Sequence, residues 1–322
     1  MGVLSYMAMI LVRTIFIVLI LASSSFSAKY AGEPFSLGVG GRTPAIGGAG
    51  VTGPFDASAG YWNPAGLNYL DKHNILAMHA ETFGSLLNHD FVSFTSKLND
   101  SSGGLIDAYG FYLYYLGGGG INITELNPQT GRPYISNVQS HGDFYLAGSL
   151  ARHVKNNMDL GVTVRLIYRD LITITGYGAS LDASALYQPS QNLRFGLMVT
   201  DLTVGFIHYS DGHTESVLPT IKPGVLFEKQ FNNFAANLVI SADIKFEGQK
   251  KASQFSAGAI SLDSHFGLET SYRGVLFGRA GFDRGDFTAG IGICISRMTF
   301  DFNYLLNSGL DDTFRASAGF QF

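Results

Sequence analysis

The feature that most constrains this chain is a recurring alternation of apolar and polar residues. In "LGVTVRLIY", residues 160–168, leucine and valine alternate with glycine, threonine and arginine. Period-two alternation is the signature of a β-strand with one apolar face. The segments 143–153, 159–169 and 178–188 each run for about ten or eleven residues, roughly twice the average strand of soluble proteins. A tilted strand needs this length to cross a bilayer.

Alternation alone does not separate a membrane β-barrel from a large secreted β-sandwich, because both give each strand one apolar face. The composition suits either class: 14% of the 322 residues are charged, 40 are glycine, and the formal net charge is −4. Such a balance gives no reason to expect nucleic acid as a partner. The single cysteine, Cys294, cannot form an internal disulfide, and a closed barrel needs none. The strand lengths therefore favour an all-β, transmembrane antiparallel barrel.

The alternation predicts fifteen candidate strands. They are 74–82, 90–98, 105–116, 143–153, 158–169, 177–188, 193–202, 221–229, 236–247, 254–262, 265–274, 275–283, 286–296, 298–306 and 313–322. Single-chain bacterial barrels have even strand numbers. Because 254–262 is among the weakest segments, we expect about fourteen strands in a monomeric barrel. The short turns at Asn156-Asn157 and Arg284-Gly285 predict periplasmic hairpins, and the longer connections 117–142 and 203–220 predict extracellular excursions.

The two ends of the chain predict its destination. Arg13 precedes an apolar stretch and the small residues 23–28, the pattern of a signal peptide. An uncleaved anchor helix is the alternative, since residues 7–12 are also apolar. At the other end, "FRASAGFQF" alternates and places Phe320 and Phe322 on one face. We expect this strand to be the signal for barrel assembly machinery, and we expect outer-membrane lipid around a barrel in the bacterial outer membrane.

These observations divide the chain into three parts. They are a signal peptide (1–28), an N-terminal hatch or plug segment (29–73) and the outer-membrane barrel (74–322). The segment 29–73 is too polar and too rich in glycine to span lipid. We therefore expect it in the lumen or at the periplasmic mouth.

Residues 31–70, "AGEPFSLGVGGRTPAIGGAGVTGPFDASAGYWNPAGLNYL", resemble the N-terminus of the PorV/PorQ proteins, which are related to the FadL-type outer-membrane transporters. The matching residues are Gly41-Arg42, Gly47–Gly50, Asp56 and Trp62–Leu67. Thr43-Pro44 departs from the small or apolar residues expected after the arginine. A looser likeness continues over most of the mature chain.

The resemblance implies a fourteen-stranded barrel with an N-terminal hatch, and two functions. PorV-type proteins serve type IX secretion and hold the C-terminal domains of secreted proteins, which makes docking of exported proteins the first expectation. FadL-type proteins pass small hydrophobic molecules around the hatch, which is the alternative. The hatch or gating residues that the resemblance points to are Arg42, Asp56, Trp62, Asn63, Pro64, Ala65 and Gly66.

The only tryptophan, Trp62, stands directly before an Asn-Pro turn. The Asn63 side chain can hydrogen-bond its own backbone, and Pro64 fixes φ, so together they predict a tight turn. We expect Trp62 to wedge against the inner wall, with its indole N–H bonded to a luminal polar group. Whether Trp62 gates the lumen or only packs there stays open.

The sequence offers little for catalysis. The histidines at 208 and 213 lie near two acidic residues, but without zinc-type spacing, so a solvated loop is preferred to a metal site. No Gly-x-Ser-x-Gly elbow is present. Cys294 is interpreted as an inert small residue. We expect no enzymatic activity, no cofactor and no metal.

Alternation also predicts which charged residues point into the lumen. They are Arg165, Arg169, Asp182, Asp243, Lys245, Glu269, Arg273, Arg279, Asp283 and Asp301. Because both signs are present, a strongly ion-selective pore is not indicated. We expect these groups to pair with one another or with the hatch, and we expect Arg42 to meet a luminal acid.

Overall fold

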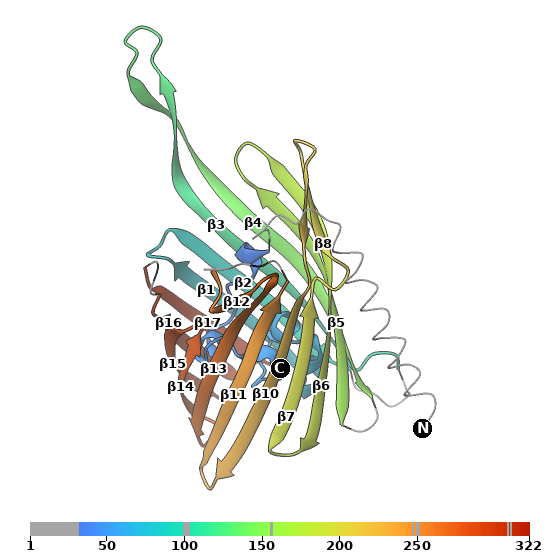
Figure 1. Cartoon of the computed structure of the whole chain (residues 1–322). Helices are drawn as coiled ribbons and strands as arrows, with labels where there is room; N and C mark the ends of the chain where they lie inside the picture. Colours follow the sequence, from blue (N-terminus) through green and yellow to red (C-terminus); the bar gives the residue numbers. More distant parts are fainter. Residues whose placement is uncertain are drawn as a thin grey trace.

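The computed structural model describes residues 32–98, 104–154, 157–246, 248, 252–307, 309 and 311–322. They form a closed antiparallel β-barrel with a segment of chain inside it (Figure 1). The predicted signal peptide lies outside the described residues. No helix in the described ranges is long and apolar enough to cross a membrane.

Fourteen strands form the wall, which is the number expected from the candidate segments and the rule that such barrels have even strand numbers. They are β1 (His73–Thr82), β2 (Leu87–Lys97), β3 (Ala108–Leu126), β4 (Pro133–Val154), β5 (Met158–Asp170), β6 (Thr175–Ser190), β7 (Leu193–Thr200), β10 (Thr220–Phe231), β11 (Phe234–Lys245), β13 (Ile260–Tyr272), β14 (Leu276–Asp283), β15 (Asp286–Ile295), β16 (Met298–Leu305) and β17 (Thr313–Gln321). The barrel closes where β1 pairs with β17, in a register that runs from Asn74 opposite Gln321 to Glu81 opposite Phe314. Closure leaves no unpaired sheet edge in the wall.

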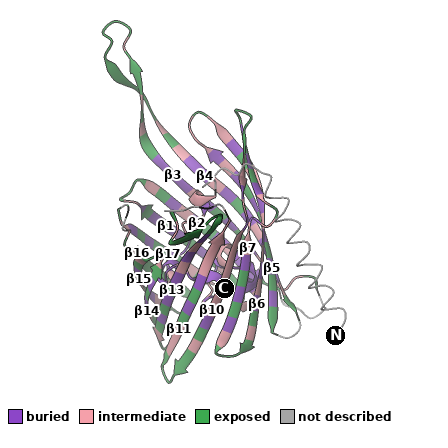
Figure 2. Ribbon diagram, in the orientation of Figure 1, coloured by how far each residue is buried: buried purple, intermediate pink, exposed green. Residues whose placement is uncertain are grey.

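The alternation determines which side chains face out and which face in. On β5, Leu160 and Leu166 are 44% and 57% exposed, whereas Thr163 and Arg165 are 0% and 8% exposed. Figure 2 shows the resulting stripes of exposed and buried residues along the strands. The apolar face is therefore outside and the polar face inside, the reverse of a soluble sandwich. The protein is an outer-membrane β-barrel.

Three regions between the wall strands differ from the sequence prediction. The candidate strand at 254–262 is reduced to the short β12 (Phe255–Ala257), which folds back on the start of β13. In the connection 203–220, β8 (Gly205–Tyr209) and β9 (Thr214–Val217) form a hairpin that pairs with β6. The connection 117–142 is largely a two-stranded ribbon, because β3 and β4 continue beyond the barrel (Figure 1).

The prediction that both short turns are periplasmic is wrong. The β4–β5 and β14–β15 hairpins lie at opposite ends of the barrel, because each crossing of an antiparallel wall reverses direction and an odd number of wall strands separates the two turns. Asn157 belongs to the end that also holds the C-terminus, and Arg284-Gly285 to the end that carries the long β3–β4 ribbon. Long loops are typical of the extracellular side. Turn length alone does not reveal which end of the barrel a turn occupies.

Phe320 and Phe322 lie at the C-terminal end of the wall and are 44% and 42% exposed. Their strand β17 pairs with β16 on one side and β1 on the other. The last strand is thus the one that closes the barrel. Its recognition by assembly machinery stays a prediction.

Residues 32–72, the luminal segment, run inside the wall before β1 begins. They contain only short helices: η1 (Glu33–Phe35), α2 (Arg42–Ala45), η2 (Gly50–Thr52), α3 (Ala59–Trp62) and η3 (Pro64–Tyr69). Glycines of the wall allow close approach. A Cβ on Gly281 would lie 2.4 Å from the Gly47 nitrogen, and a Cβ on Gly161 would lie 2.2 Å from the Ala65 nitrogen.

The contact at Gly161 gives the first prediction. Gly161→Val should displace the turn at residues 64–65, because its Cβ overlaps backbone that cannot move independently. We expect the luminal segment to become sensitive to limited proteolysis, while heat-modifiable migration on gels shows that the barrel still forms. Gly148→Val on the outer side of β4 is the control, since a Cβ there comes no closer than 3.5 Å to another residue. Equal protease resistance of the two variants would contradict the predicted contact.

Candidate functional site

The Asn63-Pro64 turn organises the luminal segment. Asn63 is completely buried, and its Oδ1 accepts a hydrogen bond from the Ala65 backbone nitrogen at 3.0 Å. Its Nδ2 donates to the Val51 carbonyl at 2.7 Å, which joins η3 to η2. Pro64 opens η3, where the missing N–H costs nothing. Gly66 lies against the ring of Phe55, where a Cβ would come within 2.6 Å.

Trp62 packs against the buried cluster that includes wall residues, and its indole N–H bonds to a polar group inside the lumen, as expected. Its indole Nε1–H donates to the Val39 carbonyl at 3.0 Å, so its partner belongs to the luminal segment itself. The ring covers Gly38 and Gly50, where a Cβ would lie 2.8 Å and 2.6 Å from the indole. These two glycines let the chain fold closely around the ring. The hydrogen bonds of Asp56 also stay within the luminal segment, because its carboxylate accepts from the Ser58 backbone nitrogen and hydroxyl.

Arg42 makes the most extensive polar connection between the luminal segment and the wall. Its Nε and Nη2 donate to both carboxylate oxygens of Glu269, at 2.8 Å and 2.7 Å, and its Nη1 donates to the Phe55 carbonyl. Glu269 also accepts from Arg279 Nε at 2.6 Å, and Arg279 Nη1 donates to Asp301. Burial opposes the charge on Arg42, but the pairing with Glu269 outweighs it and raises the pKa of Arg42 above its ordinary value.

Further ties run along the rest of the segment. Lys245 Nζ lies 2.6 Å from a carboxylate oxygen of Glu33. Arg315 donates to the carbonyls of Leu37 and Gly38. The Gly41 nitrogen donates to the Ser317 hydroxyl at 3.0 Å. The wall therefore holds the luminal segment by separate polar contacts on several strands.

Most of the charged residues predicted to face the lumen do so and pair there. Arg165 donates to Asp182 at 2.6 Å, and Arg169 donates to Asp143 at 2.6 Å. Lys222, which the prediction missed, donates to Asp243 at 2.8 Å. Those that face the lumen are Arg165, Arg169, Asp182, Asp243, Lys245, Glu269, Arg279, Asp283 and Asp301.

Arg273 is the exception. It follows the end of β13 in a turn with φ of 53°, it is exposed, and its guanidinium lies over the Tyr272 ring. The predicted strand continued past Tyr272, so the alternation was extended beyond the last paired residue. A strand end is difficult to locate from alternation when the turn residue is itself long and polar.

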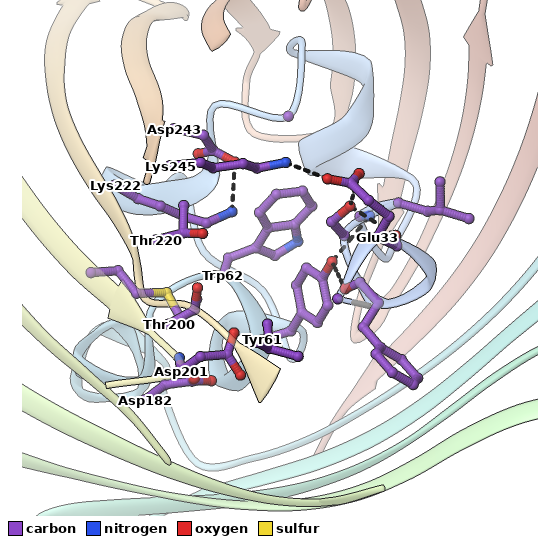
Figure 3. Close-up of a pocket in the computed structure, with 18 of the residues that line it drawn as sticks. Glu33, Tyr61, Trp62, Asp182, Thr200, Asp201, Thr220, Lys222, Asp243 and Lys245 are labelled. Atoms are coloured by element: carbon purple, nitrogen blue, oxygen red, sulfur yellow. Dashed lines mark hydrogen bonds and ion pairs between the residues drawn. The ribbon is translucent and has the colours of Figure 1, made fainter. Parts of the chain in front are cut away.

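A cavity of about 110 Å³ lies between the luminal segment and the wall. Figure 3 shows Tyr61 and Trp62 of the segment together with Asp182, Asp201 and Lys222 of the wall side. The phenylalanine, tyrosine and tryptophan residues that line the cavity are Phe35, Tyr61, Trp62, Tyr112, Tyr145 and Phe246. A buried water needs roughly 10–15 Å³ of such space, so the cavity has room for a small organic molecule.

The sequence prediction of the site missed several residues of this cavity. Tyr112 and Tyr145 occupy inward positions of β3 and β4, so the same alternation could have identified them. Asp201 follows the end of β7 with φ of 55°, and Glu33 lies in η1, so neither has a strand pattern that would signal it.

The histidines and the cysteine considered for metal binding or catalysis do not line this cavity. His208 and His213 belong to the β8–β9 hairpin, where His213 Nδ1 lies 2.5 Å from Asp211. Within the described ranges, no group of three or more His, Cys, Asp or Glu residues is placed to hold a metal ion. Cys294 is a free thiol on β15.

The fold has known structural neighbours. The Pseudomonas putida toluene transporter TodX superimposes with a TM-score of 0.54 at 11% identity, over 89% of this chain and 99% of TodX. The monoaromatic hydrocarbon channel CymD gives 0.53 at 12% identity, over 89% of this chain and 98% of CymD. A Pseudomonas aeruginosa FadL homologue gives 0.48 at 12% identity, over 85% and 96% of the two chains.

No family model and no curated protein matches the sequence. At these identities the structural likeness establishes the fold. CymD is described as a channel and TodX as a transporter. They give no support to the assignment to the PorV/PorQ proteins.

The buried Glu269 pair gives the second prediction. Glu269→Gln removes the charge that both Arg42 and Arg279 face, and loss of one member of a buried ion pair costs about 3–5 kcal/mol. We expect faster hydrogen exchange in residues 42–52 and a lower free energy of unfolding. Arg273→Gln, at the exposed turn, should change neither quantity. Unchanged exchange in Glu269→Gln would show that this ion pair does not hold the segment.

Proposed function

We propose that this protein is an outer-membrane channel for small hydrophobic molecules, with the luminal segment as its gate. The observation that carries the proposal is the cavity between the segment and the wall, which offers a binding place inside the lumen. Transport of small hydrophobic molecules, which was the alternative expectation from the sequence, thus replaces the docking of exported proteins as the main proposal. TodX is a toluene transporter and CymD a monoaromatic hydrocarbon channel, which supports the same class of cargo for this chain.

The apolar side of the lumen supports this proposal. The inner faces of β1–β5 contribute a continuous buried cluster that includes Phe91, Tyr112, Tyr114 and Tyr145, with Phe35 of the segment packed into it. The Tyr114 and Tyr145 rings stack with centroids 4.5 Å apart. Aromatic surfaces of this kind favour apolar and aromatic molecules over water.

The way the segment is held suits a gate. Its ties to the opposite side of the lumen are ion pairs and hydrogen bonds on β11, β13 and β17. Such contacts can be broken and re-formed one by one, whereas the barrel's ladder of hydrogen bonds remains intact. Passage of a molecule then requires movement of the luminal segment without opening of the wall.

A reversible disulfide that locks the luminal segment to the wall tests the proposal. A Cβ on Gly224 would lie 3.3 Å from the Val51 Cβ, close to the spacing of roughly 3.5–4.5 Å in disulfides. We expect Val51→Cys with Gly224→Cys, in a Cys294→Ser background, to lower uptake of radiolabelled toluene to that of cells without the protein. Dithiothreitol should restore it.

The matched control is Val51→Cys with Cys294→Ser, which has no second thiol and should not respond to the redox state. Equal uptake by the oxidised and reduced forms of the locked protein would contradict gating by this segment. If uptake by cells with the unlocked protein did not exceed that of cells without it, the channel proposal itself would fail.

Docking of exported proteins is the second candidate, and one observation favours it. Beyond the wall, β3 and β4 pair only with each other, and Leu126, Ile135 and Val138 are exposed on this ribbon. Replacing residues 121–139 by a short turn should abolish recovery of exported proteins in a pull-down from detergent-solubilised outer membranes. Recovery of the same C-terminal domains with the shortened chain would eliminate the ribbon as their docking site.

A further inference from the structure

One end of the cavity contains two carboxylates and one guanidinium. Arg165 Nη2 lies 2.6 Å from Asp182 Oδ1 and 3.0 Å from Asp201 Oδ1. Asp201 Oδ1 also accepts from the Ser180 hydroxyl, and Asp182 Oδ1 accepts from the Asp201 backbone nitrogen. Within the described part of the chain, the second oxygen of each carboxylate accepts no hydrogen bond. One positive charge thus faces two negative charges, with acceptor oxygens to spare.

The rest of the cavity lining does not correct this imbalance. Among the described residues that line it, six are acidic and four are lysine or arginine. Each of the four basic residues already lies beside an acid: Arg165 as above, Lys222 with Asp243, Lys245 with Glu33 and Arg284 with Asp283. His265 has Asp243 and Asp283 on its two sides. An anionic group entering the cavity would find no cation without a partner acid.

Aromatic rings surround the same space. The Tyr61 and Trp62 rings meet edge to face with centroids 5.1 Å apart, and the Tyr112 and Tyr145 rings do so at 5.8 Å. Tyr145 is 1% exposed, and its hydroxyl has no hydrogen-bond partner within the described residues. Faces of tryptophan and tyrosine attract organic cations through the ring quadrupole. A buried hydroxyl without a partner is costly, which makes this side receptive to a polar ligand.

We infer that the cavity is a binding site for small organic cations, with an ammonium group at the Asp182–Asp201 end and an apolar or aromatic body against Tyr61 and Trp62 (Figure 3). The inference rests on the proposed channel function and narrows its cargo from hydrophobic molecules in general to amphipathic amines. The ammonium supplies the missing positive charge, and the rings supply both apolar contact and cation–π attraction. A neutral hydrocarbon can make the apolar contact with the rings, but it supplies no positive charge to the two carboxylates.

The lone tryptophan provides a direct readout, because Trp62 lines the cavity and no other tryptophan contributes to the fluorescence. The full-length protein in lipid nanodiscs is titrated with benzyltrimethylammonium, with its neutral isostere neopentylbenzene, and with 3-phenylpropionate. We expect the cation to bind about ten- to thirty-fold more tightly than the isostere. The anion should bind most weakly.

Asp201→Asn should remove the preference for the cation while keeping the shape of the site. Asp211→Asn, on the exposed β8–β9 hairpin, is the matched control and should retain the preference. Equal affinities for the cation and the isostere would overturn the cation inference but leave the channel proposal standing. Saturable binding of none of the probes would also overturn the inference, whereas the channel proposal is judged separately by uptake through the redox-locked protein.

Discussion

The interaction on which this structure most depends is the buried carboxylate of Glu269, shared by Arg42 of the luminal segment and Arg279 of the wall. A barrel with polar residues inside must neutralise them without help from bulk water, since burial of an unpaired charge is prohibitive. On the wall, Arg279 alone faces the two carboxylates of Glu269 and Asp301. The second positive charge comes from Arg42 of the luminal segment. The luminal segment is thus part of the electrostatic balance of the barrel.

The lumen that results has two unlike sides. The inner faces of β1–β5 are rich in tyrosine and phenylalanine, whereas β10–β17 carry most of the ion pairs, including Lys222 with Asp243. The segment lies between them and contributes aromatic rings to one side and Arg42 and Glu33 to the other. The cavity lies at this boundary, which explains why both kinds of side chain line it. A cargo that is apolar at one end and positively charged at the other matches this arrangement.

Much of the architecture could be predicted from sequence because alternation is a property of each strand by itself. The outward apolar face and the inward charges such as Arg165 and Glu269 follow from it. The number of fourteen strands needed, in addition, the rule that such barrels have even strand numbers. Properties that depend on the assembled molecule could not be predicted. The partner of the Trp62 indole depends on how the segment folds on itself, and the position of Arg273 depends on where β13 ends. The N-terminal motif also resembles more than one group of barrels, so it specified a luminal segment better than a function.

We propose that residues 32–72 close the lumen of an otherwise complete barrel. The most direct test is the ion conductance of the full-length protein in planar lipid bilayers at low voltage. We predict no steady conductance, with at most brief openings when the segment moves. A long-lived open state in the unmodified protein, with the conductance of a water-filled fourteen-stranded pore, would contradict it.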